Sequence, residues 1–119
     1  MSSRTLAKSV GVGRFVTGTY TGNGAATQAI VGVGFQPRFV LIYTQFQALR
    51  RAMKTDRDGL NTAMTEWAVV SGSVEYHYET DQIISLDADG FTVGDGTGDA
   101  NVWNLLNENG AVYTYVAFG

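Results

Sequence analysis

The sequence predicts an all-β fold, an antiparallel β-sandwich of jelly-roll-like type, and two observations carry this prediction. Short segments rich in β-branched and aromatic residues are separated by turn residues, at a spacing of about eight to twelve residues. The chain also contains fifteen glycines and one proline, a composition typical of many tight turns. No segment repeats at a fixed period, so a solenoid is not expected.

The expected strands follow from these segments in order. They are residues 13–20, 27–31, 38–43, 62–70, 73–79, 82–86, 91–93 and 111–118. Turns are expected at 21–24 and 87–90, because Asn, Asp and Gly tolerate positive φ angles. Residues 38–43 are almost continuously apolar, which is typical of a central strand buried on both faces.

Two segments depart from the strand pattern and predict one or two short helical turns. Residues 45–54 contain good helix formers, with Phe46, Leu49 and Met53 at helical spacing; the alternative is a long loop that reaches a partner. Residues 101–107 are expected to form a short helix or a bulged loop. Residues 1–12 lack a strand period and are expected to be an N-terminal arm that contacts a partner, followed by one sandwich domain over residues 13–119.

The expected core consists of large apolar residues taken from these strands. It comprises Phe15, Ile30, Phe39, Leu41, Ile83, Leu86, Phe91, Val116 and Phe118. On the last strand, Tyr113 and Tyr115 share one face, whereas Val112, Val116 and Phe118 share the other.

Composition excludes several classes of protein. The chain has no cysteine, hence no disulfide and no thiolate nucleophile or ligand. Its apolar runs are far shorter than the roughly 18–20 residues of a membrane helix, so no membrane partner is expected. The first residues contain no apolar signal region, which predicts synthesis in a cytoplasm.

Charge is divided unevenly along the chain. Residues 1–57 hold all eight basic residues and one acidic residue, a formal charge of +7, whereas residues 58–119 hold ten acidic residues. Nucleic-acid binding is not expected, because the basic residues are scattered over arm, strand and loop. Two interpretations remain: the halves neutralise each other within one fold, or the basic half of one subunit meets an acidic neighbour.

Candidates for chemistry are few, and no enzyme is expected. His77 is the single histidine and lies in an aromatic strand without a nucleophile-elbow pattern. No cofactor or metal is expected. Asp87, Asp89, Asp95 and Asp99 are spaced like turn residues; Asp95 and Asp99, in a Gly-rich loop, are the candidates if Ca²⁺ binds.

Aromatic residues in the later strands allow a second kind of site. Stacking platforms for sugars are built from exposed aromatic rings, but alternating aromatics on strands also pack a sandwich core or a seam between subunits. The aromatic candidates are Trp67, Tyr76, Tyr78, Trp103, Tyr113 and Tyr115.

Spaced motifs carry a resemblance to a known family. They are Gly22-Asn23-Gly24, then Gly34-Phe35-Gln36-Pro37, then Asp87-Ala88-Asp89-Gly90-Phe91, and Asn109-Gly110 before the last strand. Their order and spacing resemble a domain of tailed-bacteriophage virion proteins, often found at the end of tail proteins. The resemblance implies a virion structural module, either a head decoration (cement) protein or a tail-fibre or tail-tip module that binds a host surface carbohydrate.

We expect the decoration role, because the chain begins at Met1 with a short arm and no fibre-like shaft. The resemblance then implies a homotrimer on the outer capsid surface, made in the host cytoplasm and bound to the major capsid protein. The expected contact residues are the cations and one apolar residue of the arm and of the basic segment: Arg4, Leu6, Lys8, Arg50, Arg51, Lys54 and Arg57.

Overall fold

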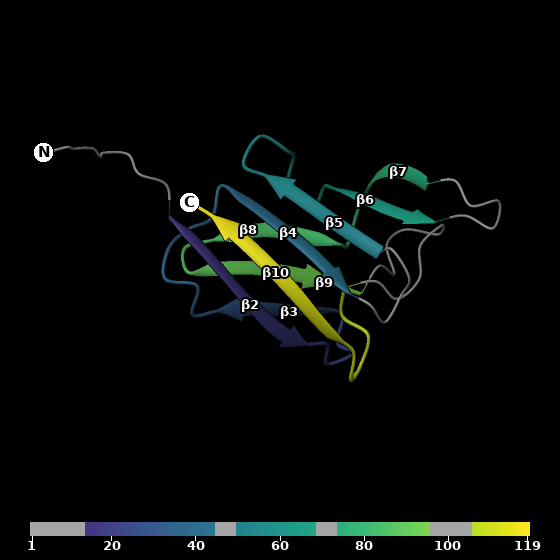
Figure 1. The fold of residues 1–119 in the computed structure, drawn as a ribbon, viewed down its shortest axis with the longest axis horizontal. Helices are drawn as coiled ribbons and strands as arrows, with labels where there is room; N and C mark the ends of the chain where they lie inside the picture. Colours follow the sequence, from purple (N-terminus) through teal and green to yellow (C-terminus); the bar gives the residue numbers. More distant parts are fainter. Residues whose placement is uncertain (1–13, 45–49, 69–73, 96–105) are drawn as a thin grey trace, which may run out of the picture.

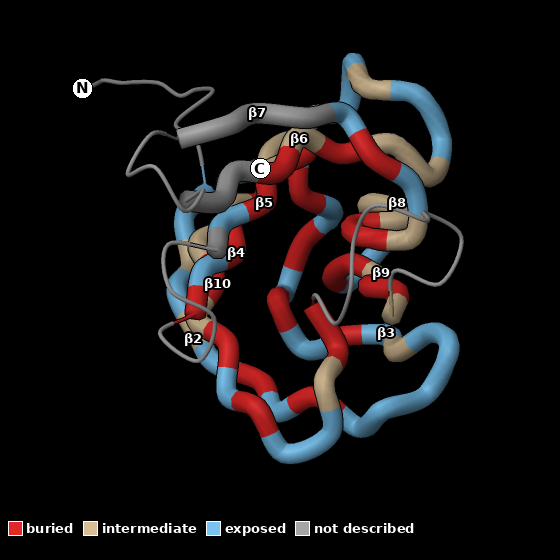
Figure 2. Tube along the Cα trace, turned by 90° about the vertical axis from the view of Figure 1, so that its right-hand side faces the viewer, coloured by how far each residue is buried: buried red, intermediate tan, exposed pale blue. Residues whose placement is uncertain are grey.

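The computed structural model describes residues 14–44, 50–68, 74–95 and 106–119, with residues 50, 66–68 and 74–77 described by their backbone alone. It confirms the predicted antiparallel β-sandwich: a large sheet lies in front of a small one in Figure 1, and Figure 2 shows the two layers edge on. The strands are β2 (Phe15–Thr21), β3 (Thr27–Val31), β4 (Phe39–Thr44), β5 (Arg50–Thr55), β6 (Ala63–Ala68), β7 (Val74–Glu79), β8 (Ile83–Asp87), β9 (Gly90–Gly94) and β10 (Val112–Phe118). Within these described residues there is no helix, and so none that could cross a membrane.

The large sheet has the order β2-β10-β4-β5-β6-β7, and the small sheet has the order β3-β9-β8. The first and last described strands are paired, with Phe15 opposite Phe118 and Thr21 opposite Val112. The ladder extends one residue further, because the amides of Arg14 and Gly119 each donate to the carbonyl of the other, at 3.1 and 2.9 Å.

Strand β3, which follows β2 in the sequence, pairs with β9, which precedes β10, and this second pair lies in the small sheet. This nesting of pairs between two sheets is the jelly-roll-like feature of the fold. Strands β4 to β7 instead form a simple meander within the large sheet.

The helical turn expected over residues 45–54 is wrong for its second half, because Arg50–Thr55 is strand β5. Its side chains alternate: Ala52 and Lys54 face the interior, whereas Arg51 is exposed. The sheet on both sides of β5 supplies hydrogen bonds that outweigh a weak helix propensity. Residues 45–49 and most of the predicted 101–107 segment lie outside the described residues, as does the arm over residues 1–12.

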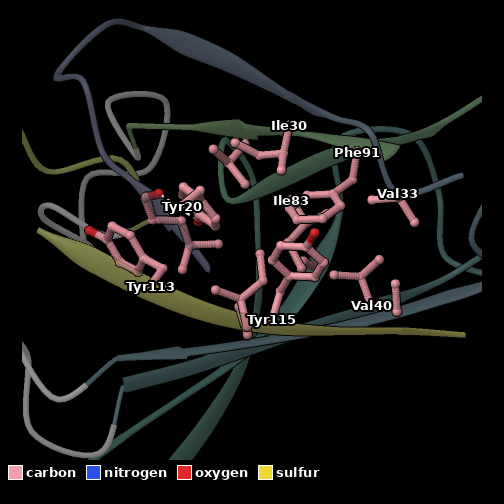
Figure 3. Close-up of a cluster of buried hydrophobic side chains, with 14 of the residues drawn as sticks. Tyr20, Ile30, Val33, Val40, Ile83, Phe91, Tyr113 and Tyr115 are labelled. Carbon is pink, nitrogen blue, oxygen red and sulfur yellow. Dashed lines mark hydrogen bonds between the residues drawn. The ribbon is translucent and has the colours of Figure 1, made fainter. Parts of the chain in front are cut away.

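Aromatic side chains fill the space between the sheets. Tyr113 and Tyr115 rise from β10 towards the small sheet, where Phe91 is fully buried (Figure 3). Tyr20 stacks on Tyr113 at 5.0 Å between ring centroids, and Phe91 meets Tyr115 edge to face at 5.1 Å. Gly18 lies opposite Tyr115 in the ladder, and a Cβ there would lie 2.6 Å from the Tyr115 hydroxyl. The glycine therefore makes room for the ring.

The predicted core is confirmed in the small sheet and partly wrong in the large one. Ile30, Ile83 and Phe91 are buried, and Leu86 packs partly buried against them. Phe15 and Phe118, in contrast, are 59% and 42% exposed. The remaining three predicted core residues, Phe39, Leu41 and Val116, are half-buried.

These core residues of the large sheet were predicted wrongly for one reason: the prediction placed the wrong face of the strands towards the interior. The face of β10 that packs inward carries Tyr113, Tyr115 and Ala117, not Val116 and Phe118. Buried tyrosines are tolerated because their hydroxyls find partners: Tyr20 donates to the Leu106 carbonyl at 2.8 Å, and Tyr113 accepts from the Glu108 amide at 3.1 Å.

Candidate functional site

The structure corrects the prediction for one of the contact residues, Lys54. It was expected to present its charge to a partner, but it faces inward and is only 4% exposed. Its Nζ donates to the carbonyls of Gly59 and Thr62, at 2.5 and 2.7 Å. Burial lowers the pKa of the Lys54 ammonium below its ordinary value, and the carboxylate of Asp58 opposes this shift. Lys54 therefore holds a loop in place instead of contacting a partner.

That loop, residues 55–62 between β5 and β6, is tied down along its length. At its start, the Asp58 carboxylate accepts from the Thr55 amide at 2.8 Å. Near its end, the Asn61 amide donates to the Ile84 carbonyl of β8 at 2.8 Å. The Asn61 and Asp81 side chains are also joined, with the Asn61 side-chain amide donating to Asp81 Oδ1 and the Asp81 amide donating to Asn61 Oδ1.

The 55–62 loop presents two side chains outward. Leu60 is 82% exposed, more than any other large hydrophobic residue among those that the structure describes, and Arg57 is exposed three residues before it. A fixed backbone that presents an exposed apolar side chain, with an exposed cation on the same loop, is suited to docking on another protein.

The other predicted contact residues are placed less closely together. Arg51 is exposed on β5, where it lies opposite Glu66 of β6 and Tyr43 of β4. Arg50 begins β5, but its side chain is not described. Arg4, Leu6 and Lys8 lie outside the described residues.

A cleft of about 550 Å³ opens beside the 55–62 loop and is lined by Arg38, Asp56, Leu60, Ile84 and Leu86 among others. Arg38 and Asp56 form an ion pair at its rim, 3.4 Å apart and well exposed to solvent. Sites for small ligands usually enclose most of the ligand's surface. The exposed Arg38–Asp56 pair, with apolar residues in the same cleft, is better suited to contact with another protein than to binding a small ligand.

The acidic residues of the β8–β9 hairpin already have partners. Asp87 accepts from the hydroxyls of Ser85 and Thr92, at 2.7 and 2.6 Å. Asp89 reaches the β3–β4 connection, where Oδ2 accepts from the Gly32 amide at 3.0 Å and Oδ1 from the Gly34 amide at 2.7 Å.

The Val33 amide completes this contact by donating to the Asp89 carbonyl at 3.1 Å. Three consecutive amides, of residues 32–34, are therefore held by one aspartate residue, and both glycines have positive φ angles that favour glycine. We call this contact the Asp89 clasp. The clasp therefore joins the turn between β8 and β9 to the connection between β3 and β4, and it brings together two of the spaced motifs of the sequence.

A cation site receives no support from these contacts. Within the described ranges, no group of three or more His, Cys, Asp or Glu side chains could hold a metal ion. Asp95 is half-buried, and its amide donates to the Ala26 carbonyl at 3.2 Å. Asp99 lies outside the described residues, so the loop suggested for Ca²⁺ is described only at its start.

The aromatic candidates for sugar stacking divide between the interior and the surface. Tyr113 and Tyr115 are buried core residues, so a platform built on them is excluded. Tyr78 is 69% exposed on β7. The side chains of Trp67, Tyr76 and His77 are not described, and Trp103 lies outside the described residues.

One broad apolar surface was missed, and we call it the outer face: the side of the large sheet turned away from the small sheet, towards the viewer in Figure 1. Strand register places Phe15, Phe118, Phe39 and Thr55 in one row across it, and Thr17, Val116, Leu41, Met53, Met64 and Tyr78 in the next. A third row holds Thr19, Thr114, Tyr43 and Arg51.

The outer face contradicts the expectation that residues 38–43 are covered on both sides. The inward residues Val40 and Ile42 are fully buried, whereas outward Tyr43 is 40% exposed. The signal was present in the sequence as an apolar run without alternation. Such a run predicts burial on both faces, but among the outward side chains Phe39 and Leu41 are half-buried and Tyr43 is exposed.

Fold and surface together define a small all-β sandwich domain with an ordered loop at one end and an open apolar sheet face. The chain belongs to a family described as a domain of unknown function (DUF7483), which it matches over residues 11–119. No match was found among curated proteins or among solved structures.

Proposed function

We propose that this chain is a bacteriophage capsid decoration (cement) protein that binds the major capsid protein on the outer head surface and stabilises the shell. The observation that carries this proposal is the 55–62 loop, which holds Leu60 in solvent on a fixed backbone. Fully burying a leucine side chain contributes about 1.5–3 kcal/mol. Because the loop is already ordered, little of that gain is lost on docking.

The charged residues around the loop fit a role in partner choice. Arg57 is exposed on the same loop as Leu60, and exposed ion pairs contribute about 0–1 kcal/mol each. Such pairs fix register more than affinity. In this proposal Arg57 and the arm residues Arg4, Leu6 and Lys8 contact the shell, whereas Lys54 supports the loop from within.

Stabilisation of a shell by this contact follows from mass action. A protein that binds the intact lattice and not its separated subunits raises the free energy needed to break the lattice. A weak contact is sufficient when it is repeated over many copies and when each oligomer bridges several capsid subunits. The order and spacing of the motifs, which resemble a domain of tailed-bacteriophage virion proteins, support this proposal.

The copy number in purified virions tests the proposal most directly. Stoichiometry close to that of the major capsid protein, measured by quantitative mass spectrometry, is the expected result. A few copies per particle would favour the alternative, a tail-fibre or tail-tip module that binds a host carbohydrate. Absence from purified particles would overturn both.

Point variants test the contact itself. Leu60→Ser combined with Arg57→Glu is expected to fold normally and to bind particles stripped of this protein at a much lower occupancy. Val31→Ser is the matched control, because Val31 is 73% exposed but lies on β3 of the other sheet. Wild-type occupancy and wild-type heat resistance of the particles with the loop variant would show that the 55–62 loop is not the contact.

A further inference from the structure

Strand β2 is an edge of the large sheet, and one of its sides is open (Figure 1). It pairs with β10 through seven consecutive residues without a bulge, and just before these Arg14 and Gly119 exchange both of their hydrogen bonds. In an antiparallel pair the backbone groups of successive residues point alternately towards and away from the neighbouring strand. The even-numbered residues of β2 therefore face β10, and the amides and carbonyls of the odd-numbered residues point to the free edge: Phe15, Thr17, Thr19 and Thr21.

These odd-numbered backbone groups have no hydrogen-bond partner within the part of the chain that the structure describes. The side chains of the same four residues are all exposed. A row of unpaired amides and carbonyls on a strand edge is a template for another strand. An extended polypeptide supplies acceptors and donors at the matching spacing, so the geometry points to a strand as the occupant.

The other sheet edges carry protection that β2 lacks. On β8, the Ile84 carbonyl accepts from the Asn61 amide at 2.8 Å, and the Leu86 carbonyl accepts from the Gln36 side-chain amide at 3.1 Å. Strand β7 contains two glutamates, and β3 is only five residues long. Covered groups, charges and short length are devices that prevent edge-to-edge pairing. Strand β2 has seven residues, none of them charged and none a proline.

The spacing of the free groups suits pairing of β2 with itself. When two β2 strands lie antiparallel about a twofold axis at Gly18, Thr17 is opposite Thr19 of the partner subunit, and Phe15 is opposite Thr21 of the partner subunit. Odd-numbered residues then meet only odd-numbered residues, so each such pair exchanges two hydrogen bonds and no edge group is left over. Threonine pairs across strands are stabilising, and like charges do not meet.

An unrelated peptide would find little to recognise along β2. Peptides that add to a sheet edge are selected by pockets that receive their alternate side chains. Neither the cleft beside the 55–62 loop nor the smaller pocket lined by Gly24, Asp95 and Asn107 includes a β2 residue. A second copy needs no such pocket, because its own β2 has the matching length and spacing.

We propose that β2 pairs antiparallel with β2 of a second copy of this chain, so that the two large sheets become one continuous sheet. The contact is isologous, because the same residues serve on both sides. It uses neither Leu60 nor Arg57, and it does not depend on the role in a virion. The homotrimer expected from the resemblance requires a cyclic contact instead, so the two arrangements predict different masses.

Hydrogen exchange of the purified full chain, followed amide by amide by NMR, tests this pairing. In a single chain β10 protects only the even-numbered amides of β2, whereas in the pair the odd-numbered amides are protected as well. Dilution should remove protection from the odd-numbered amides alone. Light scattering coupled to size exclusion should show twice the 12.8 kDa chain mass.

Two edge variants test the same contact. Thr17→Lys combined with Thr19→Lys brings lysines of both copies together beside the axis, and Thr19→Pro removes an edge amide without removing a bond to β10. Both are expected at the mass of one chain, with the even-numbered amides still protected, which shows that the sheet is intact. Thr114→Lys is the matched control: Thr114 is opposite Thr19 on the outer face but lies on β10, so this variant should keep the mass of two chains.

Three results would overturn the proposal. One is a wild-type chain of single mass at NMR concentration, whose odd-numbered amides either exchange freely or are covered by another segment of the same chain. Another is a particle of two chains that survives both edge variants or that Thr114→Lys separates, because the contact would then lie elsewhere. The third is a particle of three chains.

Discussion

Removing the Asp89 carboxylate tests whether the recurring motifs of this chain serve the fold. The two carboxylate oxygens accept from the amides of Gly32 and Gly34, at 3.0 and 2.7 Å. A hydrogen bond to a charged group contributes about 1.5–3 kcal/mol, but near solvent we take the middle of the range for ordinary hydrogen bonds, about 1 kcal/mol each. Asp89→Ala should therefore lower the free energy of unfolding by about 2 kcal/mol.

This loss should be visible as a change in melting temperature. For a domain of this length, 1 kcal/mol corresponds to roughly 3–5 °C, so Asp89→Ala is expected to melt about 6–10 °C below the wild type. Asp89→Asn keeps one acceptor oxygen and should lose about half as much. Urea unfolding followed by circular dichroism gives the free energy, and differential scanning calorimetry gives the melting temperature.

Asp56→Ala is the control for loss of a surface carboxylate. Asp56 pairs with Arg38 at 3.4 Å, with both side chains well exposed, so its loss should cost less than about 1 kcal/mol. An Asp89→Ala protein that unfolds like the wild type would refute the structural role of the Asp89 clasp. So would a Ca²⁺-dependent rise in wild-type melting temperature that disappears in Asp89→Ala, because it would make the carboxylate a cation ligand.

Three further predictions concern the interior. Phe91→Ala should lower the free energy of unfolding by about 3–5 kcal/mol, measured by urea unfolding, because a fully buried ring leaves a cavity between the sheets; a loss under 1 kcal/mol would contradict its place in the core. Burial raises the pKa of Tyr20 well above 10.0, so the unfolded chain releases this proton first and stability should fall as the pH rises above 10.0. Tyr20→Phe should weaken that fall while costing about 1–3 kcal/mol at neutral pH, because the Leu106 carbonyl loses its donor; an unchanged alkaline slope would count against it. Burial lowers the pKa of Lys54 from 10.5, so just below that pH the unfolded chain holds more protons than the folded one. This group should therefore make the free energy of unfolding rise with pH there, and in Lys54→Met that contribution should vanish. Urea unfolding at a series of alkaline pH values measures both the Tyr20 and the Lys54 effects.

Strand positions and turns could be predicted from the sequence, because they depend on local chemistry. The segment at residues 27–31 coincides with β3, and the turn expected within residues 87–90 is observed at Ala88 and Asp89, between β8 and β9. β-branched residues and turn-forming residues act over a few positions. Such signals do not require knowledge of the neighbouring strands.

Which face of a strand packs inward could not be predicted in the same way. On β10 both faces are apolar, with Tyr113 and Tyr115 on one and Val116 and Phe118 on the other. Hydrophobicity alone favours the phenylalanine side. The tyrosine side wins because Gly18 opposite makes room for one ring, and because buried hydrogen-bond partners satisfy the hydroxyls.

The site was harder to predict than the fold, for a related reason. Lys54 and Arg51 are three residues apart in a basic segment, and a helix would have placed both on one surface. In strand β5 they have opposite orientations, one buried and one exposed. The role of Lys54 then depends on the carbonyls of a loop that only the folded chain brings to it.

The pairing of Arg14 with Gly119 also determines how the domain responds to tension. The chain enters β2 and leaves β10 at the same end of their ladder. A force that pulls residues 14 and 119 apart therefore acts across the two strands rather than along them. Under such a pull the hydrogen-bonded pairs separate one after another, beginning at Arg14 and Gly119, instead of resisting together. The domain is therefore expected to open at low force when it is stretched through residues 14 and 119.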